Sequence, residues 1–200
     1  MRRFVRSPLA LVAVATIAIG CSTRDATTDS AKVHDSAMAA AAAPAAAAPS
    51  MTDANIFAVL DAANAADSSD GSVAAAKGTS ADVKAFGRDM VKDHHALRAD
   101  GQALATKLNI SPEMPAGDTS PAAAAAWHDS LVAMPKGAAF DKAYIDHEVT
   151  AHEQVLQKAQ TAEAAAQNAE LKAMLPKAAA RVQDHLDHAK RIQTKLGGAK

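Results

Sequence analysis

Apolar residues return every three or four positions along four long segments of the chain, and this period predicts α-helices. Alanine, the best helix former, accounts for 54 of the 200 residues. Val and Ile are sparse and form no alternating run, which argues against a β-sandwich or barrel. We therefore predict one all-α domain with a thin core, because alanine fills little volume. The clearest stripe runs through Val83, Phe86, Met90, His94, Leu97, Gly101, Leu104 and Leu108.

Capping and helix-breaking residues mark the ends of these segments. Residues 110–137 hold several Pro and Gly residues, and Thr119 or Ser120 opens a short extra helix there. The run 68–71 (Ser-Ser-Asp-Gly) weakens the middle of the first helix, and Pro176 kinks or splits the last one. The four long helices are predicted to run from Thr52 or Asp53 to Lys77, from Ser80 to about Asn109, from about Ala138 to Ala166, and from about Asn168 to Leu196.

The connections between the long helices are short, long and short. The first link has only a few residues, so it forces an antiparallel hairpin, whereas 110–137 can span the length of a bundle. This pattern predicts a ferritin-like four-helix bundle with one long crossover that carries the short extra helix. An up-down-up-down bundle with a bulky excursion is the alternative that the sequence leaves open.

The N-terminal segment predicts export and lipid attachment. Residues 1–20 combine three arginines with a short apolar stretch, as a signal peptide does, and the only cysteine of the chain, Cys21, follows directly. A small residue before that cysteine resembles a bacterial lipobox, so we predict a lipidated Cys21 and a periplasm-facing, membrane-anchored protein. Ser22, by resemblance to Gram-negative lipoproteins, favours the outer membrane. An ordinary signal peptide with an incidental cysteine is the alternative.

Composition limits the remaining possibilities. Residues 21–50 are rich in Ala, Pro and Ser and predict a disordered tether, which leaves 51–200 as the bundle domain. The formal net charge of −1 gives no basic surplus for nucleic-acid binding. One cysteine allows no internal disulfide. Since the chain has no glycine-rich phosphate loop and no nucleophile elbow, we assign no catalytic residue.

Each long helix carries one ionisable residue in the middle of its apolar stripe. These are Asp67, His94, His152 and His185, and Glu148 lies one turn before His152. Their similar heights predict that they meet inside the bundle in either topology. Imidazole and carboxylate ligands suit Zn, Cu, Ni or Fe, so the sequence predicts a transition-metal site.

A metal-free alternative explains the same residues. A hydrogen-bonded Asp–His layer can fix helix register without binding an ion. A di-iron carboxylate site is disfavoured, because valines stand where two Glu-x-x-His motifs would place glutamates. We expect His128 and His147 to lie on the surface without partners.

Several ordered motifs resemble the bacterial "domain of unknown function 4142" family over about 52–196. The resemblance implies exported, ferritin-like four-helix proteins that are often described as outer membrane proteins and have no established activity. It also implies a carboxylate at Asp67, where the family pattern has Glu, and histidines at 94, 152 and 185. The motifs are Val83-Lys84-Ala85-Phe86, Met90-Val91-Lys92-Asp93-His94, Phe140-Asp141-Lys142-Ala143-Tyr144, His152, Leu175-Pro176, and His185-Leu186 with Ala189.

Three functions follow from these observations. The first is a metal-binding envelope lipoprotein, and the second is a non-catalytic structural or stress-related envelope protein with protein partners that the sequence does not identify. The third, a redox enzyme on a ferritin-like scaffold, is the weakest, because the Glu-x-x-His motifs are missing.

Overall fold

The computed structural model describes residues 51–198, so the predicted signal peptide (1–20), the predicted lipidation site Cys21 and the predicted tether (21–50) lie outside the described residues. The described part is all-helical and contains no strand, which confirms the predicted class. None of its helices is both long enough and apolar enough to cross a membrane. The helices are α1 (Asp53–Lys77), α2 (Ala81–Lys107), α3 (Ser120–Ala133), α4 (Ala138–Ala165) and α5 (Ala169–Gly198).

The helix ends follow from local chemistry. Thr52 caps α1 through a capping box with Asn55, in which each side chain bonds the other residue's backbone N–H at 3.1 Å. Gly78 ends α1, and Pro121 lies in the first turn of α3, where its missing N–H costs no helical bond. The helix α5 continues through Pro176, so the predicted split does not occur, and it runs two residues past Leu196.

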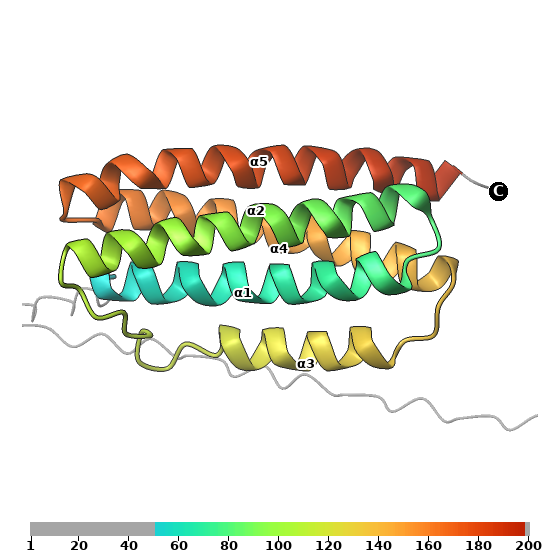
Figure 1. Cartoon of the computed structure of the whole chain (residues 1–200), viewed down its shortest axis with the longest axis horizontal. Helices are drawn as coiled ribbons and strands as arrows, with labels where there is room; N and C mark the ends of the chain where they lie inside the picture. The colour runs from blue at the N-terminus through green and yellow to red at the C-terminus, as the bar shows by residue number, and fades with distance from the viewer. Residues whose placement is uncertain (1–50, 199–200) are drawn as a thin grey trace, which may run out of the picture. The chain divides into compact units, whose positions relative to one another are not determined.

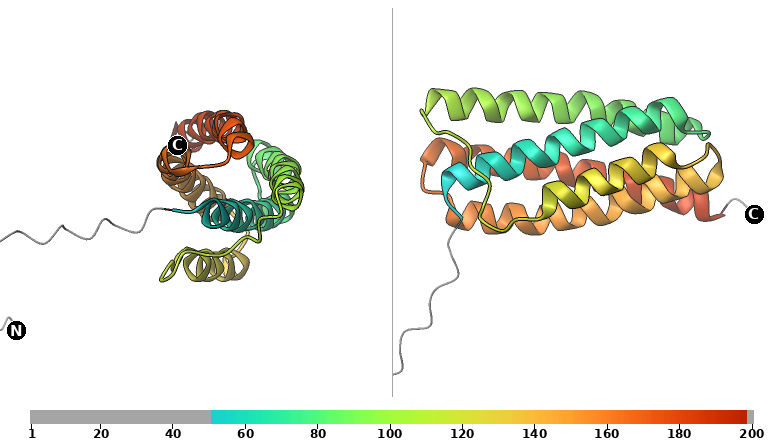
Figure 2. Two further views of the ribbon diagram at one scale, coloured as in Figure 1. Left: turned by 90° about the vertical axis from the view of Figure 1, so that its left-hand side faces the viewer. Right: turned by 90° about the horizontal axis from the view of Figure 1, so that it is seen from below.

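The four long helices form two antiparallel hairpins, α1 with α2 and α4 with α5 (Figure 1). The helices α1 and α5 run in one direction, and α2 and α4 run in the other. The chain therefore returns along the bundle between α2 and α4, and α3 lies in this crossover, outside α1 (Figures 1 and 2). Consecutive long helices would alternate in an up-down-up-down bundle, so the parallel pair α2 and α4 argues against that alternative.

The core consists of two apolar clusters with a polar layer between them. One cluster contains Phe86, Met90 and Tyr144, and the other contains Phe57 and Leu171. Along α2, α4 and α5, the buried histidines stand between the residues that join the first cluster and those that join the second. This position explains how ionisable groups come to lie in the middle of the bundle.

The helices α1 and α2 touch at two glycines. A Cβ added to Gly71 would lie 2.7 Å from the carbonyl oxygen of Gly87, and one added to Gly87 would lie 2.6 Å from the carbonyl oxygen of Gly71. Both contacts are with backbone, which cannot rotate away. Gly71 therefore permits the close approach of the two helices, and α1 is continuous through the run 68–71.

We expect Gly87→Ala to lower the free energy of unfolding by about 1–3 kcal/mol, because the new methyl group forces the two helices apart. Alanine's better helix propensity offsets about 1 kcal/mol of that loss. Gly101→Ala is the matched control on α2, since a Cβ there meets nothing within 4 Å, and it should stabilise the protein. Urea denaturation of both variants tests this, and equal stability of the two would contradict the crossing as described.

Candidate metal centre

Three buried histidines from three helices converge in the polar layer. His94 comes from α2, His152 from α4 and His185 from α5, and each is at most 5% exposed. One ligand nitrogen of each ring lies within 4.8 Å of one from each of the other two. The ring centroids are 5.7 Å apart for His94 and His152, 5.0 Å for His94 and His185, and 5.7 Å for His152 and His185.

Each ring uses one nitrogen in a hydrogen bond to oxygen. His94 Nδ1 donates to Asn64 Oδ1 at 2.8 Å, and His152 Nδ1 donates to the backbone oxygen of Glu148 at 2.9 Å. His185 Nε2 donates to Asp93 Oδ2 at 3.1 Å. Because these acceptors are oxygens, the bonded nitrogens carry the protons, and the second nitrogen of each neutral ring holds a free lone pair.

The second nitrogens are the unusual feature of the site. His94 Nε2, His152 Nε2 and His185 Nδ1 are buried and have no hydrogen-bond partner. An unsatisfied buried polar atom lowers stability by about 1–3 kcal/mol. Three such atoms in one layer therefore destabilise the fold unless a ligand binds them. Histidines that donate one N–H to an oxygen and offer the other nitrogen are characteristic of metal sites.

The electrostatics keep the rings of His94 and His152 neutral. Burial, together with the His152 and His185 imidazoles, lowers the pKa of His94 to about 2. Burial is also the main cause that lowers the pKa of His152 to about 4. Both rings are therefore neutral at pH 7, which is the form that binds a metal ion.

The two predicted carboxylates lie behind the histidines. Asp67 Oδ2 is 3.5 Å from His94 Nδ1, and Glu148 Oε2 is 3.3 Å from His152 Nδ1, so both face the protonated nitrogens. Neither belongs to the group whose ligand atoms converge. The structure thus places Asp67 and Glu148 beside the protonated ring nitrogens and outside the group of converging ligand atoms.

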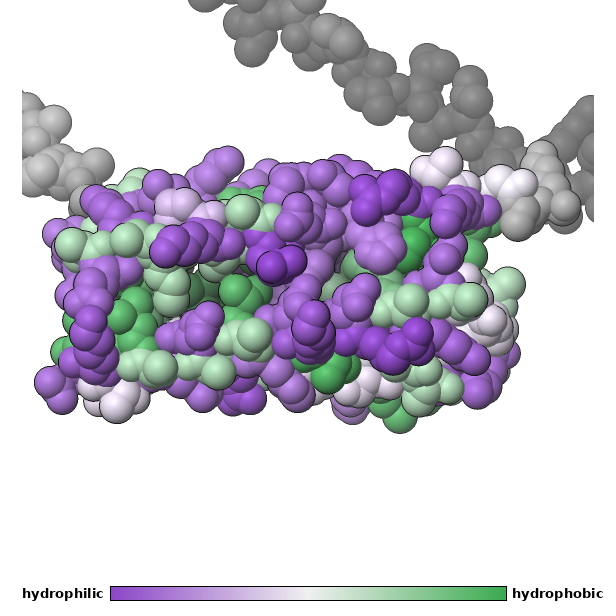
Figure 3. Space-filling model, turned by 45° about the horizontal axis from the view of Figure 1, so that its top comes forward, coloured by the Kyte–Doolittle hydropathy of each residue, from purple (hydrophilic) through white to green (hydrophobic). Residues whose placement is uncertain are grey.

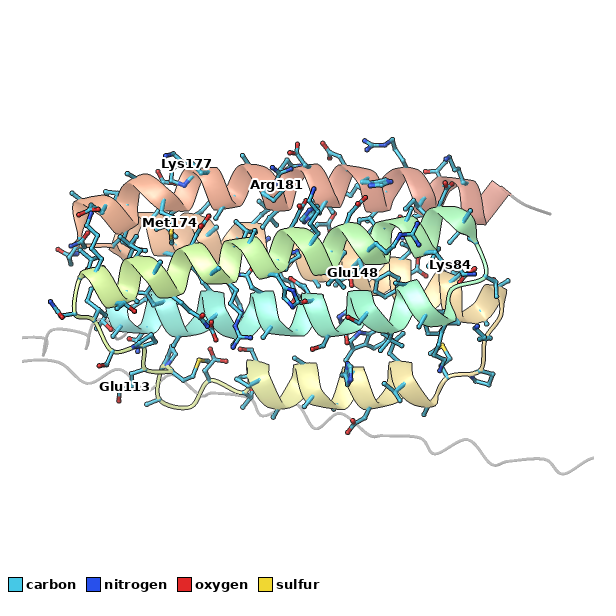
Figure 4. The ribbon with its side chains drawn as sticks, viewed as in Figure 1. Lys84, Glu113, Glu148, Met174, Lys177 and Arg181 are labelled. Carbon is cyan, nitrogen blue, oxygen red and sulfur yellow. The ribbon has the colours of Figure 1, made fainter. Side chains whose placement is uncertain are left out.

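Burial favours the protonated form of both carboxyls. Burial, and secondarily the charge of Asp70, raises the pKa of Asp67 to about 7. Burial raises the pKa of Glu148 well above its ordinary value, and the charges of Asp67 and Asp70 add to the effect. Glu148 is 1% exposed, lies inside the bundle (Figure 4), and neither of its oxygens has a hydrogen-bond partner.

Sequence reasoning missed Asn64 and Asp93, which fix the rings of His94 and His185. Asn64 stands one turn before Asp67, so the same stripe contains a signal for it. Asp93 directly precedes His94, but its partner, His185, is on α5. Helical spacing within α2 cannot predict a contact with another helix.

The expectation that His128 and His147 lie on the surface without partners is wrong. His128 Nδ1 is 2.7 Å from Asp70 Oδ1, and the ring of His147 stacks on Trp127 with centroids 3.9 Å apart. Both contacts attach α3 to the bundle. The helix α3 covers positions that would face solvent on a bare four-helix bundle, which is the reason for the error.

Comparison with known proteins identifies a family but no function. The family model described as "Domain of unknown function (DUF4142)" matches residues 37–192. No curated protein and no solved structure matches the chain.

Proposed function

Because the chain belongs to the DUF4142 family, as its motifs predicted, and the function of this domain is unknown, we propose its function from the site itself. The protein binds one transition-metal ion through His94, His152 and His185. Two observations carry this proposal: one ligand nitrogen from each buried ring converges on the others, and each ring has a buried nitrogen without a hydrogen-bond partner.

The ligand set limits the choice of metal. Three neutral imidazoles suit Zn²⁺, Cu²⁺, Ni²⁺ or Fe²⁺ and leave a coordination position for water or an outer ligand. Asp67 and Glu148 stand behind the rings, so a carboxylate-bridged di-iron pair is not the proposed form. We propose a role in metal binding or buffering.

The fold and location complete the proposal. The order of helix directions and the single long crossover support a ferritin-like bundle. The lipobox-like sequence at Cys21 supports a lipid-anchored protein that faces the periplasm, and Ser22 favours the outer membrane. Cys21→Ser is expected to abolish incorporation of labelled fatty acid in bacterial cells. Equal labelling of both proteins would remove the anchor from the proposal.

A metal-free polar layer is the second candidate. It is supported by the hydrogen bonds that already hold one nitrogen of each ring and by the position of the layer between two apolar clusters. In that role the layer sets helix register in a non-catalytic envelope protein. It leaves the three unpartnered nitrogens unexplained.

Metal content separates the two candidates. We expect the tag-free protein, purified without chelators, to contain or take up about one metal ion per chain, measured by elemental mass spectrometry. A His94→Ala/His152→Ala variant is expected to lose at least about 100-fold in affinity, because two of three ligands are removed. His95→Ala is the matched control, since His95 is exposed. No uptake of any of the four metals would favour the metal-free layer.

A further inference from the structure

A cavity of about 650 Å³ extends from the histidine layer toward the end of the bundle where α2 ends and α5 begins. Its lining follows helical spacing on three helices, from His94 to Ala105 on α2 and from Val182 back to Met174 on α5, with α1 alongside. Small residues at inward positions leave this space open. A Cβ added to Gly101, for example, would meet nothing within 4 Å.

The interior of the cavity is mostly apolar. Phe57, Leu60, Leu97, Met174 and Val182 contribute to its lining. Figure 3 shows apolar residues in a hollowed part of the surface, surrounded by hydrophilic side chains. A cavity of this size and lining is typical of sites for small organic molecules.

Two basic side chains of α5 line the cavity, and neither has a close acidic partner. Arg98 is neutralised by Asp61 through two hydrogen bonds of 2.8 and 3.1 Å. Lys177 and Arg181 stand one turn apart on α5 (Figure 4). Lys177 takes part in no ion pair of the described residues, and Arg181 reaches only Asp93 and Asp184, at 3.8 and 3.9 Å.

The two other acids of the lining form no ion pair with Lys177 or Arg181. Asp100 is exposed and pairs with no cation among the described residues, and Asp67 contacts His94 in the histidine layer, at 3.5 Å. A ligand with an anionic group would therefore be attracted to the Lys177 and Arg181 side of the opening, while its apolar part leaves water for the interior.

We propose that this cavity binds an amphiphilic organic carboxylate. The apolar chain or ring lies along Leu60, Leu97 and Met174, and the carboxylate pairs with Lys177 and Arg181. This site extends beyond the metal proposal and does not depend on it, because none of these contacts involves the metal.

Decanoate is the probe, titrated into the full chain by calorimetry, and NMR contacts with Leu97 and Phe57 locate it. We expect saturable binding of decanoate and weaker binding of decanol and decylamine. Lys177→Gln/Arg181→Gln should weaken decanoate about five- to tenfold, whereas Lys172→Gln, which removes an exposed lysine of α5 outside the cavity, should change nothing. Equal affinities of the double variant and the control, or of decanoate and decanol, would overturn the anionic assignment.

Filling the cavity tests the location. Gly101→Leu and, as a second variant, Ala178→Leu should each reduce decanoate binding more than tenfold and leave metal content unchanged. The proposal is overturned if the unmodified protein does not bind decanoate or if both filled variants, shown to be folded, bind it normally. Loss of metal in the histidine variant with decanoate binding retained separates this site from the metal centre.

Discussion

Adding Zn²⁺ to the metal-free protein is expected to raise its free energy of unfolding by about 4 kcal/mol when free metal exceeds the dissociation constant a thousandfold. The site links two separate parts of the fold, because His94 belongs to the α1–α2 hairpin whereas His152 and His185 belong to the α4–α5 hairpin. In the proposed site, the ion would also satisfy the three ring nitrogens that have no hydrogen-bond partner. The ion is therefore expected to bind the folded protein, in which the three ligands converge, more tightly than the unfolded chain.

Urea denaturation with chelator and with buffered Zn²⁺ measures the effect. His94→Ala/His152→Ala should lose the metal-dependent gain, and His95→Ala should keep it in full. A gain of the same size in the double variant would place the metal elsewhere in the chain. A smaller gain in the unmodified protein at saturating metal would indicate that the unfolded chain, with its eight histidines, also binds the ion.

Local sequence signals predicted where the helices begin and end. The capping residue Thr52 and the terminating Gly78 act over one helical turn, so they can be interpreted without knowledge of the fold. Pro176 shows the limit of such signals, because a proline breaks a helix only where packing allows it. Leu171 and Leu175 before it and Val182 after it are buried on the same helix, and this packing holds α5 together.

The height and the face of the histidines were predictable, whereas the role of each atom was not. The apolar stripe predicts that His94 points inward, but it does not predict which ring nitrogen lacks a hydrogen-bond partner. That depends on Asn64 and Asp93, whose contacts join residues 30 and 92 positions apart. The same holds for Asp67 and Glu148, which share the layer but lie behind the rings.

The crossover was the least predictable part. Its short helix was expected from Pro121 and its neighbours, but its docking position depends on long-range contacts such as the stack of Trp127 on His147. The small inward residues indicated a thin core and room for cavities. Only the packed bundle shows that this space adjoins the histidine layer and opens beside Lys177.

Asp67→Asn is expected to stabilise the metal-free protein increasingly as pH rises from 4 to 7. The pKa of Asp67 is raised from 3.8 in the unfolded chain to about 7 in the folded protein. A raised pKa contributes stability that is complete below the unfolded value and is lost as pH rises through the folded value. The loss reaches at most about 4 kcal/mol above pH 7, since one pKa unit corresponds to 1.36 kcal/mol.

Asparagine keeps the shape of a neutral Asp67 and has no proton to lose, so the variant avoids this penalty. Part of the gain is transmitted through Glu148, whose pKa is also raised by the Asp67 charge. His94, with a pKa of about 2, stays neutral in the folded protein over the whole window and does not obscure the difference between the two proteins.

Chelator-treated samples of both proteins, unfolded in urea at pH 4, 5.5, 7 and 8, give the required curves. Asp61→Asn is the control of opposite sign, because the Arg98 contact lowers the pKa of Asp61, and its substitution should cost stability at neutral pH. A pH-independent difference between Asp67→Asn and the unmodified protein would show that Asp67 is ionised in the fold. In that case the carboxylate behind His94 would carry a full negative charge, and the ring would bind metal as a more basic ligand.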